Sequence, residues 1–71
     1  MSLEMNMQIT LNGQKKDIPE PSTVEQLLHQ LSLKGPLAVE LNRKVCPKKM
    51  HGQTHLQPGD IVEIVTLVGG G

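Results

Sequence analysis

The end of the chain constrains the fold more than any other stretch of these 71 residues. Ile61 to Val68 form a largely apolar run, which predicts a buried or half-buried strand. Three glycines, Gly69 to Gly71, follow at once, so every side chain is lost where the strand ends. A chain this short makes one domain, residues 1–71, with a simple fold and a modest core. We expect residues 1–4 to be an expression remnant or a disordered start.

The composition excludes several function classes. The chain has no Phe, Tyr or Trp, so its core is built from aliphatic residues, and it has no aromatic platform for single-stranded nucleic acid. Seven basic residues balance seven acidic ones, so the chain has no strong net charge that would attract nucleic acid or a membrane surface. A single cysteine suits a reducing cytosol. With no signal-peptide pattern and no membrane-spanning run, we expect a cytoplasmic protein.

The first half of the chain predicts a hairpin. Met7 to Leu11 alternates apolar and polar residues, as a strand with one buried face does. Asn12-Gly13 is a strong hairpin signal, because both residue types tolerate positive φ. Gln14 to Ile18 returns as a mostly polar second strand with Ile18 facing the core. Pro19-Glu20-Pro21 ends the hairpin, since proline cannot continue a ladder.

A helix follows the hairpin. Ser22-Thr23-Val24-Glu25 matches a capping box, with Ser22 as the N-cap and Glu25 reaching back to its amide. The apolar positions at i, i+3, i+4 and i+7 share one stripe: Val24, Leu27, Leu28 and Leu31. We expect this helix to run to about Ser32.

Three further strands complete the pattern. Leu37 to Leu41 alternates again, and a turn over residues 42–44 leads to a short strand at Val45-Cys46. Pro47 to Gly52 is polar and allows one helical turn. Pro58-Gly59-Asp60 places proline and glycine where a type II turn needs them, directly before the last strand.

This order predicts an α+β protein with the β-grasp, or ubiquitin-like, fold. A mixed four- to five-stranded sheet would pack on one main helix, with the last strand parallel to the first and a right-handed crossover. Val62 and Ile64 would face the helix. Val65 and Leu67, continued by Val68, would form a candidate partner surface on the other face. The alternative is that they are ordinary scattered apolar surface residues.

The glycine tail suggests a chemical role. Three extended residues span about 10 Å, enough to carry the α-carboxylate of Gly71 into a partner's active site. Gly69 and Gly70 would thread through a narrow passage, because glycine has no Cβ. We therefore predict that the Gly71 carboxylate is the working group. The alternative is a frayed terminus or a linker.

Several stretches of the chain together resemble one family. They are Ile9–Gly13, Thr23–Leu28, Leu37–Asn42, Pro58–Val65 and Val68–Gly71. The chain from Met7 to Gly71 resembles the ThiS family of sulfur carriers in its size, in the order of its expected strands and helix, and in its terminal glycines. The MoaD proteins of molybdopterin synthesis share the fold and the diglycine end. The chain has three final glycines where the minimal pattern of the family has two. We expect the additional one, Gly69, to lengthen the tail without changing its role.

The resemblance implies a mechanism for the Gly71 carboxylate. A ThiF-type adenylating enzyme would use ATP and magnesium to convert it to an acyl-adenylate. Sulfur from a cysteine desulfurase persulfide would then displace AMP, and thiazole synthase (ThiG) would take sulfur from the thiocarboxylate to build the thiazole of thiamine. The chain would be a protein co-substrate and not an enzyme, with no bound cofactor, and a monomer when free.

Three other functions stay open. They are a MoaD-like small subunit of molybdopterin synthase, a ubiquitin-like modifier, and a β-grasp binding module with an inert tail. Cys46 could relay sulfur, but a half-buried structural cysteine is the better expectation. His51 and His55 lack rigid spacing and a further ligand, so we expect no metal site. The basic residues between the strands predict a solvated loop that could dock on an acidic patch: Arg43, Lys44, Lys48 and Lys49.

Overall fold

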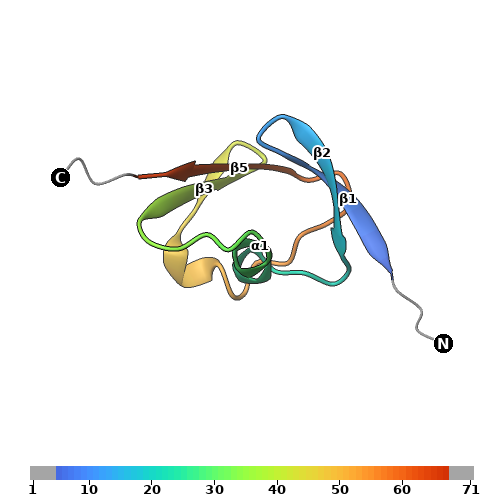
Figure 1. The fold of residues 1–71 in the computed structure, drawn as a ribbon, viewed down its shortest axis with the longest axis horizontal. Helices are drawn as coiled ribbons and strands as arrows, with labels where there is room; N and C mark the ends of the chain where they lie inside the picture. Colours follow the sequence, from blue (N-terminus) through green and yellow to red (C-terminus); the bar gives the residue numbers. More distant parts are fainter. Residues whose placement is uncertain (1–4, 68–71) are drawn as a thin grey trace.

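The computed structural model describes residues 5–67, in which one α-helix crosses one face of a five-stranded sheet (Figure 1). The elements are β1 (Asn6–Leu11), β2 (Gln14–Pro19), α1 (Val24–Gln30), β3 (Leu37–Leu41), β4 (Lys44–Cys46), a 3₁₀ turn (Lys48–Met50) and β5 (Ile61–Thr66). The strand order is β2-β1-β5-β3-β4, with β5 parallel to β1 and antiparallel to β3. The predicted β-grasp fold is confirmed. The expectations for residues 1–4 and 69–71 lie outside the described residues.

Two hairpins flank the central strand, and each has a two-residue turn. At Asn12-Gly13 the φ angles are 49° and 83°, and at Asn42-Arg43 they are 52° and 71°. Positive φ at both positions is the type I′ turn, whose twist matches that of the strands it joins. The first turn is as predicted. The second is tighter than predicted, because Lys44 already pairs with Leu41 in the ladder.

The helix begins one residue later than the predicted capping box. Thr23, not Ser22, is the N-cap: its hydroxyl accepts from the Gln26 amide at 3.1 Å, and the Gln26 side chain accepts from the Thr23 amide at 2.8 Å. The Ser22 hydroxyl instead donates to the Pro19 carbonyl at 2.6 Å. The prediction of Ser22 and Glu25 as the box is therefore wrong, because the Ser22 hydroxyl is engaged by the Pro19 carbonyl, three residues earlier.

The helix also ends earlier than predicted, at Gln30 instead of Ser32. Ser32 has a φ of 56°, which no helix continues. Its amide donates to the His29 carbonyl and the Leu33 amide donates to the Leu28 carbonyl, both at 3.0 Å. This pair of bonds is the Schellman motif, with serine at the position that usually holds glycine.

The segment between β4 and β5 closes over the start of the helix. The Val24 and Glu25 amides, which have no partner within the helix, donate to the Thr54 and His51 carbonyls at 3.0 Å. The 3₁₀ turn confirms the predicted helical turn after Pro47.

A further turn leads from this segment into β5. Gly59 has a φ of 87°, and the Asp60 amide bonds the Gln57 carbonyl at 3.0 Å, as expected for the predicted type II turn.

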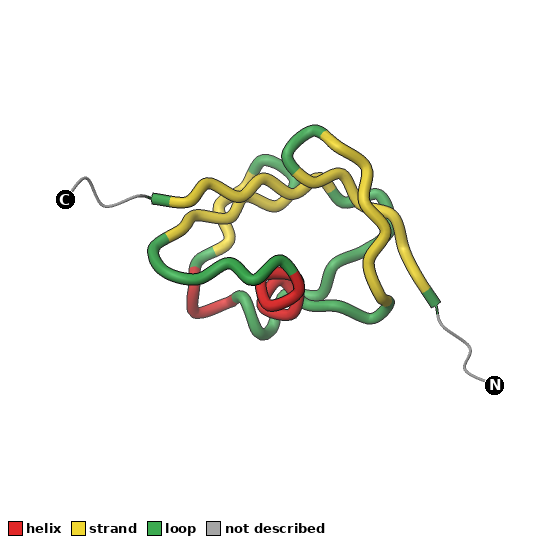
Figure 2. Tube along the Cα trace, viewed as in Figure 1, coloured by secondary structure: helices red, strands yellow, loops and turns green. Residues whose placement is uncertain are grey.

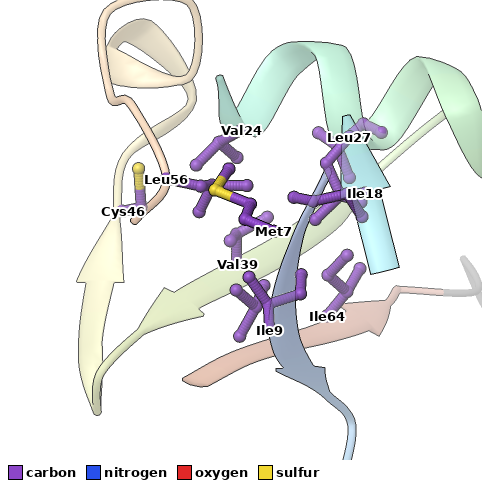
Figure 3. Close-up of a cluster of buried hydrophobic side chains, with 11 residues drawn as sticks. Met7, Ile9, Ile18, Val24, Leu27, Val39, Cys46, Leu56 and Ile64 are labelled. Atoms are coloured by element: carbon purple, nitrogen blue, oxygen red, sulfur yellow. The ribbon is translucent and has the colours of Figure 1, made fainter. Parts of the chain in front are cut away.

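The core lies between the helix and the concave side of the sheet (Figures 2 and 3). As the composition predicts, it contains only aliphatic side chains and the sulfur-containing side chains of methionine and cysteine. Its residues are Met7, Ile9, Ile18, Val24, Leu27, Leu28, Val39, Cys46, Leu56, Val62 and Ile64. Four of the strands, β1, β2, β3 and β5, contribute one or more apolar residues to this core, and β4 contributes Cys46. Burying this set supplies most of the driving force for a domain of this size.

Strand β5 occupies the centre of the sheet, and its two faces differ. Val62 and Ile64 are buried against the helix side, as predicted. The strand ends at Thr66, two residues before its predicted end at Val68. Leu67 follows outside the strand, and Val68 lies outside the described residues.

Candidate functional site

The candidate site is the junction where β5 leads into the glycine tail. Ala38 and Leu37 of β3 pair with Val65 and Thr66 of β5. One residue further, the Leu67 amide donates to the Pro36 carbonyl at 2.9 Å. Backbone hydrogen bonds thus fix the direction of the chain up to Leu67.

The opposite edge of β5 is held differently. Its parallel ladder with β1 covers only Thr10 and Leu11, which face Ile61 and Val62. The side chain of Asn12 then continues this ladder to the Ile64 backbone.

Beyond Ile64, this edge of β5 has no strand partner in residues 5–67. Since backbone groups alternate along a strand, the Thr66 amide and carbonyl point to the same side as those of Ile64. No described strand pairs with that side at Thr66. A partner that takes the tail could therefore pair with this edge.

The outer face of β5 carries exposed apolar side chains. Val65 is 58% exposed, Leu67 52% and Ile61 46%. Val65 and Leu67 therefore lie where the sequence predicts, at the end of β5 nearest the tail. Between them and Ile61 lies Glu63, which faces Glu40 across the strand pair. Like charges in this position destabilise a sheet, so a basic surface placed against Glu40 and Glu63 would relieve their repulsion. The role of the face as a partner surface stays a prediction.

The remaining tail residues of the predicted site, Val68, Gly69, Gly70 and Gly71, lie outside the described residues. Their roles therefore rest on the sequence. What the structure adds is the direction and anchoring of the strand that precedes them.

The weaker sequence candidates lie at the end of β4 and in the segment that follows it, not on the strand that leads to the tail. Cys46 is buried, and its sulfur lies 3.6 Å from the Thr54 hydroxyl. The buried His51 ring places Nε2 3.0 Å from the Cys46 carbonyl, whereas His55 is exposed. Within residues 5–67, no three His, Cys, Asp or Glu side chains gather as a metal site would require. The same part of the chain contains no helix long and apolar enough to cross a membrane.

Sequence reasoning missed two residues that shape the junction, Asn12 and Pro36. The Asn-Gly pair predicted a turn, but nothing in the pattern showed that the Asn12 side chain bonds a strand fifty-two positions away. The sequence pattern likewise gave no sign that Pro36 takes part in this junction. Its carbonyl fixes Leu67, a contact that depends on the register of β3 and β5.

A mixed five-stranded sheet with β5 at its centre, parallel to β1, and one helix across its face defines a ubiquitin-like protein of the β-grasp class. The chain belongs to the ThiS family, whose model matches residues 7–71. The resemblance predicted from the sequence is thereby confirmed. The crystal structure of the thiamine biosynthesis protein ThiS from Geobacter metallireducens superposes with a TM-score of 0.79 at 32% identity, covering 92% of this chain and all of that one. A solution structure from the same organism gives 0.78 at 33% identity, covering 92% and 88% of the two chains.

Curated sequences extend the comparison. The chain is 33% identical over 70 residues to the uncharacterized protein ycf40 of Porphyra purpurea, covering 97% of this chain and 99% of that protein. It is also 36% identical over 66 residues to a thiazole synthase of Paramagnetospirillum magneticum. That match covers 92% of this chain but only 20% of the synthase. The larger relative therefore contains a ThiS-like segment within a longer polypeptide.

Proposed function

We propose that this chain is the sulfur carrier of thiamine biosynthesis and bears the sulfur as a thiocarboxylate on Gly71. The observation that carries the proposal is the ThiS family match over residues 7–71. The fold supports it, since the Geobacter ThiS structure matches nearly the whole chain. The anchored end of β5 adds a physical reason, because backbone hydrogen bonds hold the chain up to Leu67, directly before the tail.

The chemistry requires activation by another protein. A carboxylate is a poor electrophile until one of its oxygens becomes part of a good leaving group. A ThiF-type enzyme supplies this by transferring AMP from ATP, with magnesium, to the Gly71 carboxylate and releasing pyrophosphate. Persulfide sulfur supplied by a cysteine desulfurase then attacks the acyl carbon and displaces AMP. A thiol reductively releases the resulting acyl disulfide as the thiocarboxylate.

The carrier itself contributes position and access rather than acid, base or metal chemistry. Glycines at Gly70 and Gly71 leave the acyl carbon unshielded by side chains. The chain is thus a protein co-substrate, with no cofactor of its own. A reducing cytosol suits both this chemistry and the free thiol of Cys46.

The proposed acceptor of the sulfur is a thiazole synthase. The Paramagnetospirillum relative supports this pairing, because a segment similar to this chain shares a polypeptide that is named a thiazole synthase.

Intact mass spectrometry tests the proposal. The protein is incubated with a ThiF-type enzyme, ATP, magnesium and sulfide, and we expect a mass shift equal to replacement of one oxygen by one sulfur. Deletion of Gly71 should abolish the shift. Gly70→Val should fold with an unchanged unfolding midpoint but lose adenylation.

Absence of a shift with an active enzyme would contradict a carrier function. A cell assay then separates thiamine from molybdopterin synthesis. Expression of the chain should restore growth without thiamine to a strain lacking its own sulfur carrier, and should not restore molybdoenzyme activity to a strain lacking a MoaD protein.

A further inference from the structure

An open cleft lies on the helix side of the domain, close to the end of β5. It has a volume of about 630 Å³ and is lined by the last turn of α1, the segment leading into β3, and the 3₁₀ turn. Its apolar lining comes chiefly from Leu28, Leu33 and Leu37. The first two are brought together by the Schellman motif, because the Leu33 amide bonds the Leu28 carbonyl.

The charges around this cleft are unequal. Lys34 and Lys48 line it and are exposed, and Glu25 is the only acidic residue in its lining. The two lysines come from different segments, Lys34 from the loop that follows α1 and Lys48 from the 3₁₀ turn. Such a cleft fits a group that combines a carboxylate with an aliphatic side chain, since the carboxylate can pair with a lysine while the apolar part is buried.

The cleft is continuous with the tail junction. Pro36 and Leu37 line it, and the same two residues hold the end of β5. The Pro36 carbonyl accepts from the Leu67 amide, and Leu37 pairs with Thr66. The described end of β5 thus adjoins this cleft, within reach of a protein that binds the tail.

We infer that the cleft is a docking site for the thiazole synthase, which inserts a segment carrying an acidic side chain beside an aliphatic one. The inference rests on the proposed function and names a contact for it on the helix side, distinct from the apolar outer face of β5. The synthase is favoured over the adenylating enzyme because the relative with a ThiS-like segment in its own chain is a thiazole synthase.

The test is a pair of matched double charge reversals. Lys34→Glu/Lys48→Glu alters the cleft, and Lys15→Glu/Lys44→Glu makes the same change in net charge elsewhere. Lys15 and Lys44 are exposed. Across the sheet Lys15 is aligned with Ile61 and Lys44 with Val62, so both lie beside the end of β5 that is away from the tail. Each protein is first checked for its unfolding midpoint and for thiocarboxylate formation by intact mass.

Binding to purified thiazole synthase is then measured by titration calorimetry. We expect the cleft reversal to raise Kd about tenfold or more and the control reversal to change it by less than about threefold. Lys34→Arg/Lys48→Arg should bind within about threefold of the native chain. The cleft effect should diminish as salt is added, because the contact is electrostatic.

Other outcomes would overturn the inference. If both reversals bind the synthase equally, the cleft is not its docking site. If the cleft reversal weakens only the adenylating enzyme, the cleft serves activation instead.

The chain's own tail is the remaining occupant to exclude. If deletion of residues 68–71 shifts the NMR signals of Lys34 and Lys48 in the free chain, the cleft holds the tail and the inference fails. Failure of the proposed function is separately visible: the native chain itself would form no thiocarboxylate and would not bind the synthase.

Discussion

The side-chain amide of Asn12 is bonded to the backbone of Ile64 as a neighbouring strand would be. Its Oδ1 accepts from the Ile64 amide at 2.8 Å, and its Nδ2 donates to the Ile64 carbonyl at 3.3 Å. Asn12 thus has two roles, since its backbone also makes the type I′ turn. It supports β5 beyond the point where the ladder with β1 ends, in the strand that leads to the tail.

Replacing Asn12 with glycine should therefore destabilise the domain. Glycine keeps the positive φ of the turn but removes both bonds, and the partly buried Ile64 backbone then loses its partner. We expect a loss of about 1–3 kcal/mol in the free energy of unfolding, measured with urea. Gln14→Ala, at an exposed site beside the same turn, serves as the control and should change stability by less than about 0.5 kcal/mol. Equal losses would show that the Asn12 bonds contribute nothing.

The corrected helix cap gives a second prediction. A double-mutant cycle on Thr23 and Gln26, each changed to alanine, should show a coupling energy of about 0.5–1 kcal/mol, because their bonds are reciprocal. The same cycle on Ser22 and Glu25 should show almost none. Coupling in the second cycle alone would restore the box predicted from the sequence.

The end of the helix gives a third prediction, this time of increased stability. Ser32 has a φ of 56°, where a side chain is strained and glycine is not. Ser32→Gly should raise the free energy of unfolding by about 1 kcal/mol. Gln30→Gly, two residues earlier in the last helical turn, should lower it by about 0.5–1 kcal/mol. The opposite signs of two glycine substitutions so close together distinguish relief of strain from a general effect of glycine.

The outer face of β5 gives a fourth prediction. Val65→Asp should slow adenylation by the ThiF-type enzyme about tenfold in kcat/KM, because it places a charge in the proposed apolar contact beside the tail. Ile61→Asp makes the same change on the same face at the other end of the strand. It should reduce kcat/KM by less than about threefold.

Both aspartate variants should unfold at similar urea concentrations, since Val65 and Ile61 are similarly exposed. Equal effects on adenylation would remove Val65 from the partner surface. An effect confined to Ile61→Asp would move that surface to the opposite end of β5.

The strands and turns were predictable because their signals are local. Alternation marks one buried face of β1 and β3, and the Asn-Gly and Pro-Gly pairs specify backbone angles that few other residues adopt. The helix was predictable for the same reason, but its limits were not. Its start depends on a bond between Ser22 and Pro19, and its end on serine adopting a conformation that is more common for glycine.

The features that shape the candidate site were harder to predict because they join distant segments. The contacts of Asn12 with Ile64 and of Pro36 with Leu67 exist only once the sheet is assembled. The cleft likewise combines residues from three segments. The tail is the converse case, since its proposed role was predicted from the glycines in the sequence alone.

The central position of β5 has a consequence for how the protein is made. The ribosome delivers β1 and β2, then β3 and β4, before the strand that joins them. Each hairpin can form as it emerges, but an isolated two-stranded ribbon is marginally stable. The nascent chain therefore completes its sheet only after Ile61–Thr66 leaves the exit tunnel, and until then neither hairpin has the strand that joins it to the other.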